Sequence, residues 1–532
     1  MNNINSTTEE YKKITFKLGG SSSRMFGKQG YNIKIRGNKE LHGRTQIKLR
    51  PDAREATFLR TKLASDIHKR IGIPSISANY ATLYINDEYL GLYILLDPIK
   101  KSWIEYEYGD VDTTGLYECG SSGNDLTVKR SSRGCTNEND DVTDNSELIE
   151  LLTAFDNANS AADIEDIFDI DLFLTEIAYE YLAGSWDHYL IIGHNFNLYK
   201  PTNGKWMFLL TDFDGDLGQD VSMGIVGMKE DPYKPERANF ENYSFNEWAH
   251  FPLHLIDILI KKDPTRFNVI LENIVKEVFN PAILFPRIDE LKNFIRPYVE
   301  ADKKLNKDGK LPGKLNEQAN SYSLAEWDAN CEFTTVSTMQ KSRAYGLKYW
   351  ILSKYRYVCK NYDMECDPIY MNDNYEYEVD ENVEAPIEDD RWLDWGSSPQ
   401  PTTIVEPPQP TTIVEPPQPT TIVEPPQPTE TSTPFIPEGQ RPELFEMTDN
   451  TVPVIRITMP DSEFDDLKEK ASRGYRMYQP DGTSASLNHL FSSDAAKSLD
   501  WSIVYNPPPG FDPLEQAPFE TKNAAMTFEI NG

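Results

Sequence analysis

Positive charge is scarce in this sequence of 532 residues. Lys and Arg together number 53 against 85 Asp and Glu, which gives a formal net charge of −32. Proteins that bind nucleic acids neutralise phosphates with basic surfaces, so this composition argues against that class of function. Much of the acidic excess lies in residues 364–397, where we expect a solvated acidic tail.

Long apolar runs are missing as well. No stretch approaches the roughly 20 apolar residues that a membrane-spanning helix needs. The opening MNNINSTTEEYKK lacks the apolar core of a signal peptide. From these absences we expect a soluble chain in which no targeting segment is visible.

Cysteine is rare, with five residues, and no two of them have the CxxC spacing typical of zinc sites. Cys119 and Cys135 flank a polar loop rich in Ser and Gly and would pair if the protein is secreted. Because the number is odd, one thiol is left over, and the cysteines do not settle the compartment.

What the sequence does contain is a pattern of strands around a flexible loop. Apolar and polar residues alternate in residues 13–18, 31–37 and 43–50, which predicts three strands. The first two flank the loop GGSSSRMFGKQG, and the third carries Lys48. Apolar residues at helical spacing in residues 54–70 predict a helix that ends before Gly72.

Residues 81–97 (ATLYINDEYLGLYILLD) are typical of a hairpin that turns at Asn86–Asp87. The expected order is therefore strand, glycine loop, strand, strand, helix, strand, strand. This is the order of a protein-kinase small lobe, although the order of elements alone does not establish a function.

Beyond residue 146 the pattern becomes helical. Amphipathic segments occupy residues 146–158 and 170–184, and further helices are expected within residues 246–362. Between them, FNLYK and KWMFLL are short strands joined by the turn sequence PTNG.

The last part of the chain differs in composition. PTTIVEPPQ occurs three times from Pro401, which predicts an extended linker of polyproline II character. VPVIRITM, SEFDDLKEKA and AAMTFEING then predict a strand, a helix and a strand. Because Ile530–Asn531 matches Ile4–Asn5, we interpret this tail as the opening of a second copy of the N-terminal module.

These patterns together predict an α+β fold with a kinase-like, two-lobed arrangement and a partial second module. The expected units are a β-rich small lobe (1–130), a helical large lobe (131–365), an acidic and then Pro/Thr-rich disordered linker (366–440) and a partial module (441–532).

Chemistry concentrates in residues 184–216, GSWDHYLIIGHNFNLYKPTNGKWMFLLTDFDGD. A helix precedes Asp187, and two strands separate Asn195 from Asp212 and Asp214. Strands bring the ends of loops together, so these residues can converge. In phosphoryl transfer one Asp accepts the proton of the substrate hydroxyl, while Asn and Asp oxygens hold Mg²⁺. A surface acidic turn is the alternative interpretation of DFDGD.

At these residues the chain resembles the CotH kinase family, the spore-coat-protein-H-like atypical kinases. The resemblance covers roughly residues 13–355. It depends on five stretches in order, which are LGGSSSRMFGKQGYNIKIRG, FLRTKLASDIHKRIGIP, YATLYINDEYLGLYILLD, GSWDHYLIIGHNFNLY and KWMFLLTDFDGDLG. It implies a diverged kinase fold that uses ATP with Mg²⁺ or Mn²⁺ to phosphorylate proteins. Related modules occur in extracellular, multi-modular fungal proteins.

The resemblance also assigns roles. Asp187 matches the catalytic Asp, Asn195 and Asp212 match the metal ligands, and Asp214 is a helper. This chain departs from the family pattern because eight positions separate Asp187 from Asn195, so Asn197 is a rival ligand. Thr211 also stands where the family usually has Trp before its first metal-binding Asp.

The phosphates of ATP need backbone amides and positive charge around them. The resemblance and the glycine loop together assign this role to Gly19, Gly20, Ser21, Ser22, Ser23, Arg24, Lys28 and Lys48. For each cation alone, a plain surface charge is the alternative.

Three functions remain open at this point. The first is a secreted or surface protein Ser/Thr kinase acting on itself or on another protein. The second is a non-catalytic scaffold or adhesion module held on the linker. The third is a calcium-dependent structural domain built on DFDGD, which lacks the Glu that closes an EF-hand loop.

Overall fold

The computed structural model describes residues 7–530 with several gaps. Residues 21, 223–238, 317–320, 340–341, 386–433, 474, 479, 482–483, 487–513 and 517 lie outside the described part. The fold is of the α+β class, as the sequence predicted. Within the described residues, no helix has both the length and the apolar composition needed to cross a bilayer.

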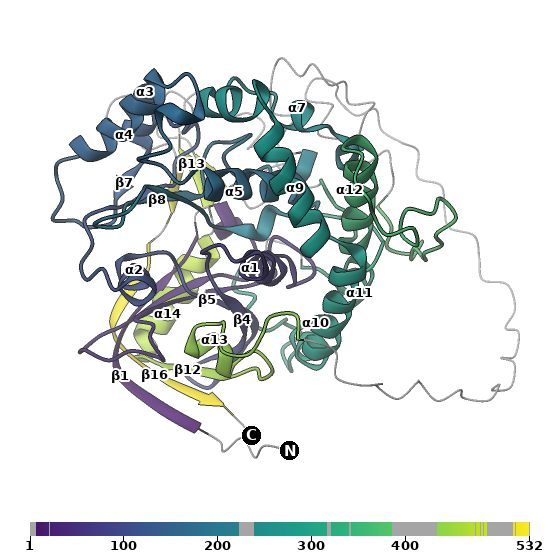
Figure 1. The fold of residues 1–532 in the computed structure, drawn as a ribbon. Coiled ribbons are helices and arrows are strands. Elements are labelled where there is room, and N and C mark those ends of the chain that lie inside the picture. The colour runs from purple at the N-terminus through teal and green to yellow at the C-terminus, as the bar shows by residue number, and fades with distance from the viewer. Residues whose placement is uncertain are drawn as a thin grey trace, which may run out of the picture.

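Seven strands form a closed barrel in the spatial order β1-β16-β12-β4-β5-β3-β2. Figure 1 shows its long strands β1 and β16 side by side below the helices. The barrel strands are β1 (Thr7–Leu18), β2 (Tyr31–Ile35), β3 (Gln46–Arg50), β4 (Ala78–Ile85), β5 (Glu88–Leu96), β12 (Val454–Thr458) and β16 (Glu520–Ile530).

The N-terminal order predicted from the sequence is confirmed. β1 and β2 flank the glycine loop, β3 follows, and α1 (Arg60–Ile71) comes before the hairpin of β4 and β5. The helix begins later than its apolar spacing suggested. Asn86 and Asp87 have φ of 46° and 65°, the left-handed pair that a two-residue hairpin turn requires.

A four-stranded sheet in the order β7-β6-β8-β9 stands beside the barrel, and helices surround it. Its strands are β6 (Leu116–Cys119), β7 (Thr136–Asn137), β8 (Phe196–Tyr199) and β9 (Met207–Leu210). Smaller strands are β10 (Val336–Ser337), β11 (Arg343–Ala344), β13 (Tyr475–Tyr478), β14 (Ser484–Ser486) and β15 (Leu514–Gln516).

Helices are the main regular elements in the described part of residues 101–361. At the centre lies α5, which begins at the N-cap Asp169 and is buried along almost its whole length. The helices are α2 (Lys101–Tyr108), α3 (Val128–Gly134), α4 (Ser146–Asn157), α5 (Ile170–Ala183), α7 (Phe245–Trp248), α8 (His254–Ile256), α9 (Thr265–Glu277), α10 (Pro281–Asp302), α11 (Leu324–Asn330) and α12 (Leu347–Asn361).

Short turns complete this region, and two further helices lie in the C-terminal part. The 3₁₀ turns are η1 (Ser22–Met25), η2 (Ala161–Asp163), η3 (Phe213–Gly215) and η4 (Phe240–Asn242), and η5 (Asp257–Lys261) is a π-helical turn. The C-terminal helices are α13 (Glu443–Met447) and α14 (Asp461–Arg473).

Two disulfides lie in the helical region. Cys119 pairs with Cys135, as the sequence allowed, and Cys359 pairs with Cys366. Cys331 is a buried free thiol.

The acidic stretch after residue 365 differs from the expected start of a disordered linker. Tyr377 stacks on Phe333 with ring centroids 4.5 Å apart, and the amide of Ala385 donates to the carbonyl of Thr335. Residues 366–385 therefore pack against the helical region, and the Pro/Thr repeats of the predicted linker lie outside the described residues.

The tail also differs from the separate module that the sequence predicted. β16 pairs with β1 and with β12, and β12 pairs in parallel with β4. The described strands β12 and β16 therefore belong to the same barrel as the N-terminal strands. The sequence alone did not reveal which strands the tail would meet, and its interpretation as a partial repeat stays a prediction.

Candidate active site

A cleft of about 660 Å³ lies between the barrel and the open end of the β8–β9 hairpin. Residues of β1, β2, β3 and β16 line one side of it, and Asn195, Asn197, Thr211 and Asp212 line another. We call this space the cleft. Its cationic lining consists of Lys17, Lys34, Arg36, Lys48, Arg50, Lys100 and Lys522.

The chain reaches the cleft at the C-terminal end of α5. The helix ends at Gly184, whose φ is 64° and where an added Cβ would lie 2.3 Å from the Trp350 ring. A side chain at this position would therefore disturb both the turn and its packing. Trp186 then anchors the loop, because its indole nitrogen donates to the carbonyl of Gln219 at 2.8 Å. Asp187 follows directly.

The hairpin places Asn195 beside Asp212. Phe196 pairs with Leu210 at its open end, and the amide of Thr211 donates to the carbonyl of Asn195 at 2.9 Å. Asn195 and Asp212 both have left-handed backbones, with φ of 59° and 70°. These dihedrals are uncommon for residues other than glycine and tend to cluster at functional sites.

Asp187 is held by its neighbours. His194 Nε2 lies 2.6 Å from Asp187 Oδ1, and Asn195 Nδ2 donates to the Asp187 carbonyl at 2.9 Å. Burial alone would raise the pKa of Asp187, but the hydrogen bond and charge of His194 and the charge of Arg54 lower it. The carboxylate is therefore ionised at neutral pH and fixed in direction.

Two arginines connect the three carboxylates. Arg54 Nη1 lies 3.4 Å from Asp187 Oδ2 and 3.5 Å from Asp214 Oδ1. Arg50 forms ion pairs with Asp212 and, at 2.8 Å, with Asp214 Oδ2. Residues that lie far apart in sequence thus converge, and Arg50 and Asp212 of this group line the cleft.

The three Asp of DFDGD differ in protonation. Burial alone would raise the pKa of Asp212, but the charge of Arg50 lowers it well below the ordinary value. Burial raises the pKa of Asp214 to about 6 despite both arginines. Burial raises the pKa of Asp216 to about 8, and Tyr179 donates to that carboxyl at 2.6 Å. Asp216 is therefore buried at the end of the DFDGD loop and connects it to Tyr179 of α5.

His188 and Phe213 support the same loop. His188 Nε2 donates to the carbonyl of Thr211 at 2.8 Å, and its ring stacks on Phe213. Burial lowers the pKa of His188 to about 4, so the ring is neutral at pH 7.

Comparison with known proteins identifies the chain. Residues 16–351 match the family described as CotH kinase protein. The chain belongs to the CotH family.

Relatives of this CotH chain are proteins of fungal and bacterial origin. Invasin CotH3 of Rhizopus delemar is 26% identical over 66% of this chain and 60% of its own length. Invasin CotH2 of the same fungus is 25% identical over 56% of this chain and 52% of its own length. Inner spore coat protein H of Bacillus subtilis is 19% identical over 54% of this chain and 78% of its own length. The chain thus spans little more than half of the two invasins.

Of the residues assigned to phosphate binding in this CotH chain, the structure brings Gly20 and Lys48 to the cleft. Burial and the charge of Arg50 lower the pKa of Lys48. Gly19, Ser23 and Arg24 are not among the described cleft-lining residues. Ser21 and the side chain of Ser22 lie outside the described part.

Lys28 lies elsewhere. It forms a buried ion pair with Asp302, and its ammonium donates to the carbonyl of Leu92 at 2.9 Å. The ammonium also stands 4.6 Å from the centre of the Tyr93 ring. Lys28 ties the end of the glycine loop to α10, so the structure does not place it where the sequence predicted.

The metal assignment involves two carboxylates and one amide. Among the described residues, no three His, Cys, Asp or Glu side chains form a ligand group. The oxygens of Asp212, Asp214 and Asn195 are nevertheless hard donors of the kind Mg²⁺ and Mn²⁺ prefer. Asn197 also lines the cleft, is buried, and has an amide nitrogen without a hydrogen-bond partner in the described part of the chain.

The sequence interpretation missed Arg50 and Arg54. Arg50 could have been found, because it follows Lys48 by two positions in a strand and so shares its face. Arg54 lies in a loop, where no periodicity points to it. His194 stands directly before Asn195 in the sequence, but its hydrogen bond to Asp187 depends on the fold.

Proposed function

We propose that this CotH-family chain is an atypical protein kinase that transfers the γ-phosphoryl group of ATP to Ser or Thr of a protein. In this proposal the barrel is the small lobe of a two-lobed kinase-like fold and the helical region is the large lobe. The observation that supports it is the convergence of Asp187, Asp212 and Asp214 on two shared arginines, of which Arg50 lines the cleft together with Asp212.

Each group would have a defined task. Asp187 orients the substrate hydroxyl and accepts its proton as the oxygen attacks the γ-phosphorus and the bond to ADP breaks. Lys48 and Arg50 on β3 offer positive charge to the phosphates. Asp212, Asp214 and Asn195 would hold Mg²⁺ or Mn²⁺, which neutralises phosphate charge when bound.

Arg50 adds a condition to metal binding. In the structure its guanidinium contacts both Asp212 and Asp214. A dication and Arg50 would compete for these oxygens, so we infer that Arg50 turns toward the phosphates when the metal binds.

The experiment is transfer of labelled γ-phosphate from ATP, with Mg²⁺ or Mn²⁺, to the chain itself and to a generic protein acceptor. Asp187→Asn should lower the rate by about 10²–10⁴-fold, since a positioned base contributes that much. Asp171→Asn is the matched control, because its carboxylate is exposed and pairs with Arg266 on the helical side. Equal labelling by the wild-type chain and Asp187→Asn would refute the assignment.

A non-catalytic scaffold or adhesion module is the second candidate. The charge of Arg50 and Arg54 against the acidic cluster favours it, because the carboxylates are stabilised without a metal. The names of the invasin relatives point in the same direction. An extracellular or cell-surface location is part of both proposals.

Thermal unfolding separates the two candidates. A ligand that binds only the folded state stabilises it by about 2.7 kcal/mol at one hundred times its Kd. A rise in Tm with millimolar ATP and Mg²⁺ supports the kinase. No shift with any nucleotide and metal supports the scaffold.

A further inference from the structure

The C-terminal segment completes the barrel of the N-terminal part. β16 pairs with β1 from Thr7 opposite Ile530 to Lys17 opposite Glu520. β12 lies between β16 and β4, with Val454 beside Thr82. Without this segment, β1 and β4 would each present an unpaired edge, which is a template for another strand.

The two parts also share one apolar core. Side chains of β12, α14 and β16 are buried with those of β1, β2 and β5 in a single cluster. The contribution of the segment includes Ile455, Ile457, Phe464, Leu467, Met526 and Phe528. Burial of apolar side chains stabilises the contact, so the segment is bound by more than strand pairing.

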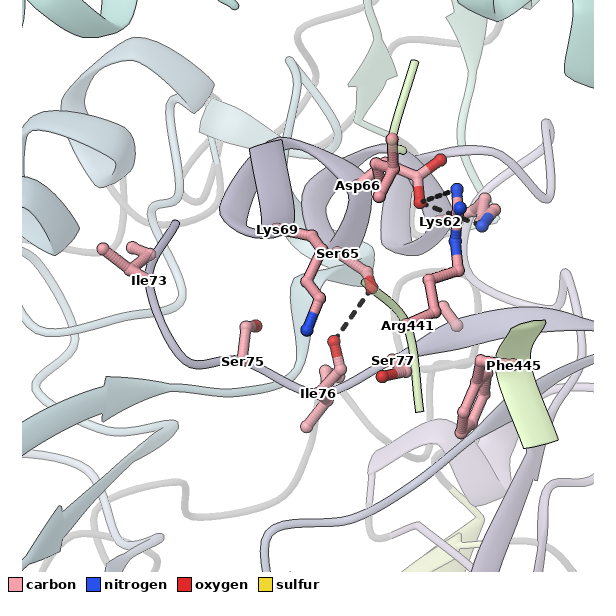
Figure 2. A pocket seen from close by; sticks show the side chains of 12 residues that line it. Lys62, Ser65, Asp66, Lys69, Ile73, Ser75, Ile76, Ser77, Arg441 and Phe445 are labelled. Atoms are coloured by element: carbon pink, nitrogen blue, oxygen red, sulfur yellow. Dashed lines mark hydrogen bonds and ion pairs between the residues drawn. The ribbon is translucent and has the colours of Figure 1, made fainter. Parts of the chain in front are cut away.

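Charged groups fasten the start of the segment to the rest of the molecule. Arg441 and Asp449 meet Lys62 and Asp66 of α1 and Arg287 of α10, and we call these five residues the clasp. Figure 2 shows Lys62, Asp66 and Arg441 turned toward one another beside a small pocket. Arg441 Nη2 lies 3.2 Å from Asp449 Oδ1, and Lys62 Nζ lies 2.9 Å from Asp66 Oδ1.

Two asparagines of the β4–β5 hairpin form hydrogen bonds with the backbone of the segment. Asn79 Nδ2 donates to the carbonyl of Phe445 at 2.8 Å. Asn86 Nδ2 donates to the carbonyl of Met459 at 2.8 Å, and the amide of Met459 donates back to Asn86 Oδ1 at 2.9 Å. Because these bonds need one register, the barrel selects a particular partner segment.

Strands β16 and β1 are arranged as a hairpin, although they come from opposite ends of the described chain. Ile530 lies opposite Thr7, and the sequence Ile530–Asn531 repeats Ile4–Asn5. This is the geometry expected when two strands that follow each other in one repeat are supplied by different copies of it.

We propose that residues 436–530 form an exchangeable segment, by which one copy of this chain completes the barrel of a second copy. The contacts of the segment are the same whether it comes from its own chain or from another, as in domain swapping. The stretch 386–433 contains the Pro-rich repeats, and such sequences extend by about 3 Å per residue. As its linker lengthens, the effective concentration of a tethered segment at its own barrel falls. The segment of a neighbouring chain that is held close by then competes for this barrel, and the two chains exchange segments. The proposal does not depend on phosphoryl transfer.

The test uses cysteines at facing positions of the barrel. Glu10 lies opposite Thr527, so Glu10→Cys in one full-length chain and Thr527→Cys in another can form a disulfide only across two chains. The two variants, with different affinity tags, are coexpressed and isolated by both tags in turn. A non-reducing gel should show a species of twice the chain mass.

Two controls make every outcome decisive. Glu10→Cys paired with Glu520→Cys should give no such species, because Glu520 lies opposite Lys17 instead. A single chain with both Glu10→Cys and Thr527→Cys should link to itself. If this double variant links fully while the mixed single variants never do, the segment stays with its own chain and the exchange is wrong. If the double variant fails to link, the strand pairing on which the proposal depends is overturned.

Discussion

Two clusters of paired charges in this molecule differ in the sign of the charge that is in excess. The cleft cluster sets three carboxylates against Arg50 and Arg54, and its Asp212 side chain is 32% exposed. The clasp sets Lys62, Arg287 and Arg441 against two carboxylates, and its Asp66 side chain is 2% exposed. Lys62, Asp66 and Arg287 of the clasp are buried, whereas Asp212 of the cleft cluster is partly exposed and lines the cleft. We therefore expect the clasp to act on stability and the cleft cluster to act on ligands.

The largest effect should separate the two clusters by activity. Asp212→Asn should lower phosphoryl transfer by about 10²–10⁴-fold, because it removes an expected metal ligand. Its free energy of unfolding should change by less than about 1 kcal/mol, because Arg50 keeps its pair with Asp214. Transfer rates and urea unfolding of the same preparation check both parts. A variant that unfolds as readily as it loses activity would erase the contrast.

The converse substitution lies in the clasp. Asp66→Asn should lower the free energy of unfolding by about 3–5 kcal/mol, because it leaves Lys62 and Arg441 with Asp449 as their remaining clasp partner and Arg287 with Asp449 and Glu290. Transfer per folded molecule should stay the same. The matched control is Asp289→Asn, whose half-exposed carboxylate pairs with Lys348 and should cost less than about 1 kcal/mol. Equal losses in the two variants would contradict a special role for the clasp.

Acid should act on the clasp in a defined direction. Burial alone would raise the pKa of Asp66, but Lys62, Arg287 and Arg441 lower it from 3.8 to about 2. A carboxylate whose pKa is lowered by folding stabilises the folded state above its unfolded pKa. This stabilisation, on the order of 2 kcal/mol, should disappear as pH falls from about 4 to about 2. Urea unfolding at several pH values should show a smaller slope in this range for Asp66→Asn than for the wild-type chain.

The smallest effect distinguishes two lysines. Lys48→Met should weaken ATP binding about tenfold, because Lys48 lines the cleft. Lys28→Met should leave ATP binding unchanged and instead lower stability, because Lys28 pairs with the buried Asp302. Calorimetric titration with ATP and thermal unfolding measure the two quantities. Weaker ATP binding by Lys28→Met would instead support the phosphate-binding role that the sequence predicted for Lys28.

The sequence predicted the positions of helices and strands better than it predicted which of them pair or pack together. Alternation and turn residues located the strands before and after Asn86–Asp87, and the spacing of the Asp187 loop and the hairpin indicated a shared site. These are local signals. The positions of Lys28 and Arg54 depend on α10 and on the cleft, which no local period encodes. β16 likewise pairs with β1 and β12, which lie next to it only in the fold, and no sequence pattern in these strands indicates which partner each will have.

The pairing of Thr7 with Ile530 has a consequence for synthesis. Strand β1 leaves the ribosome long before its neighbour β16 is made. The barrel of one chain therefore cannot close until β16 has been made, and until then the edge of β1 is unpaired. Contacts of such high sequence separation slow folding and favour encounters with other nascent chains.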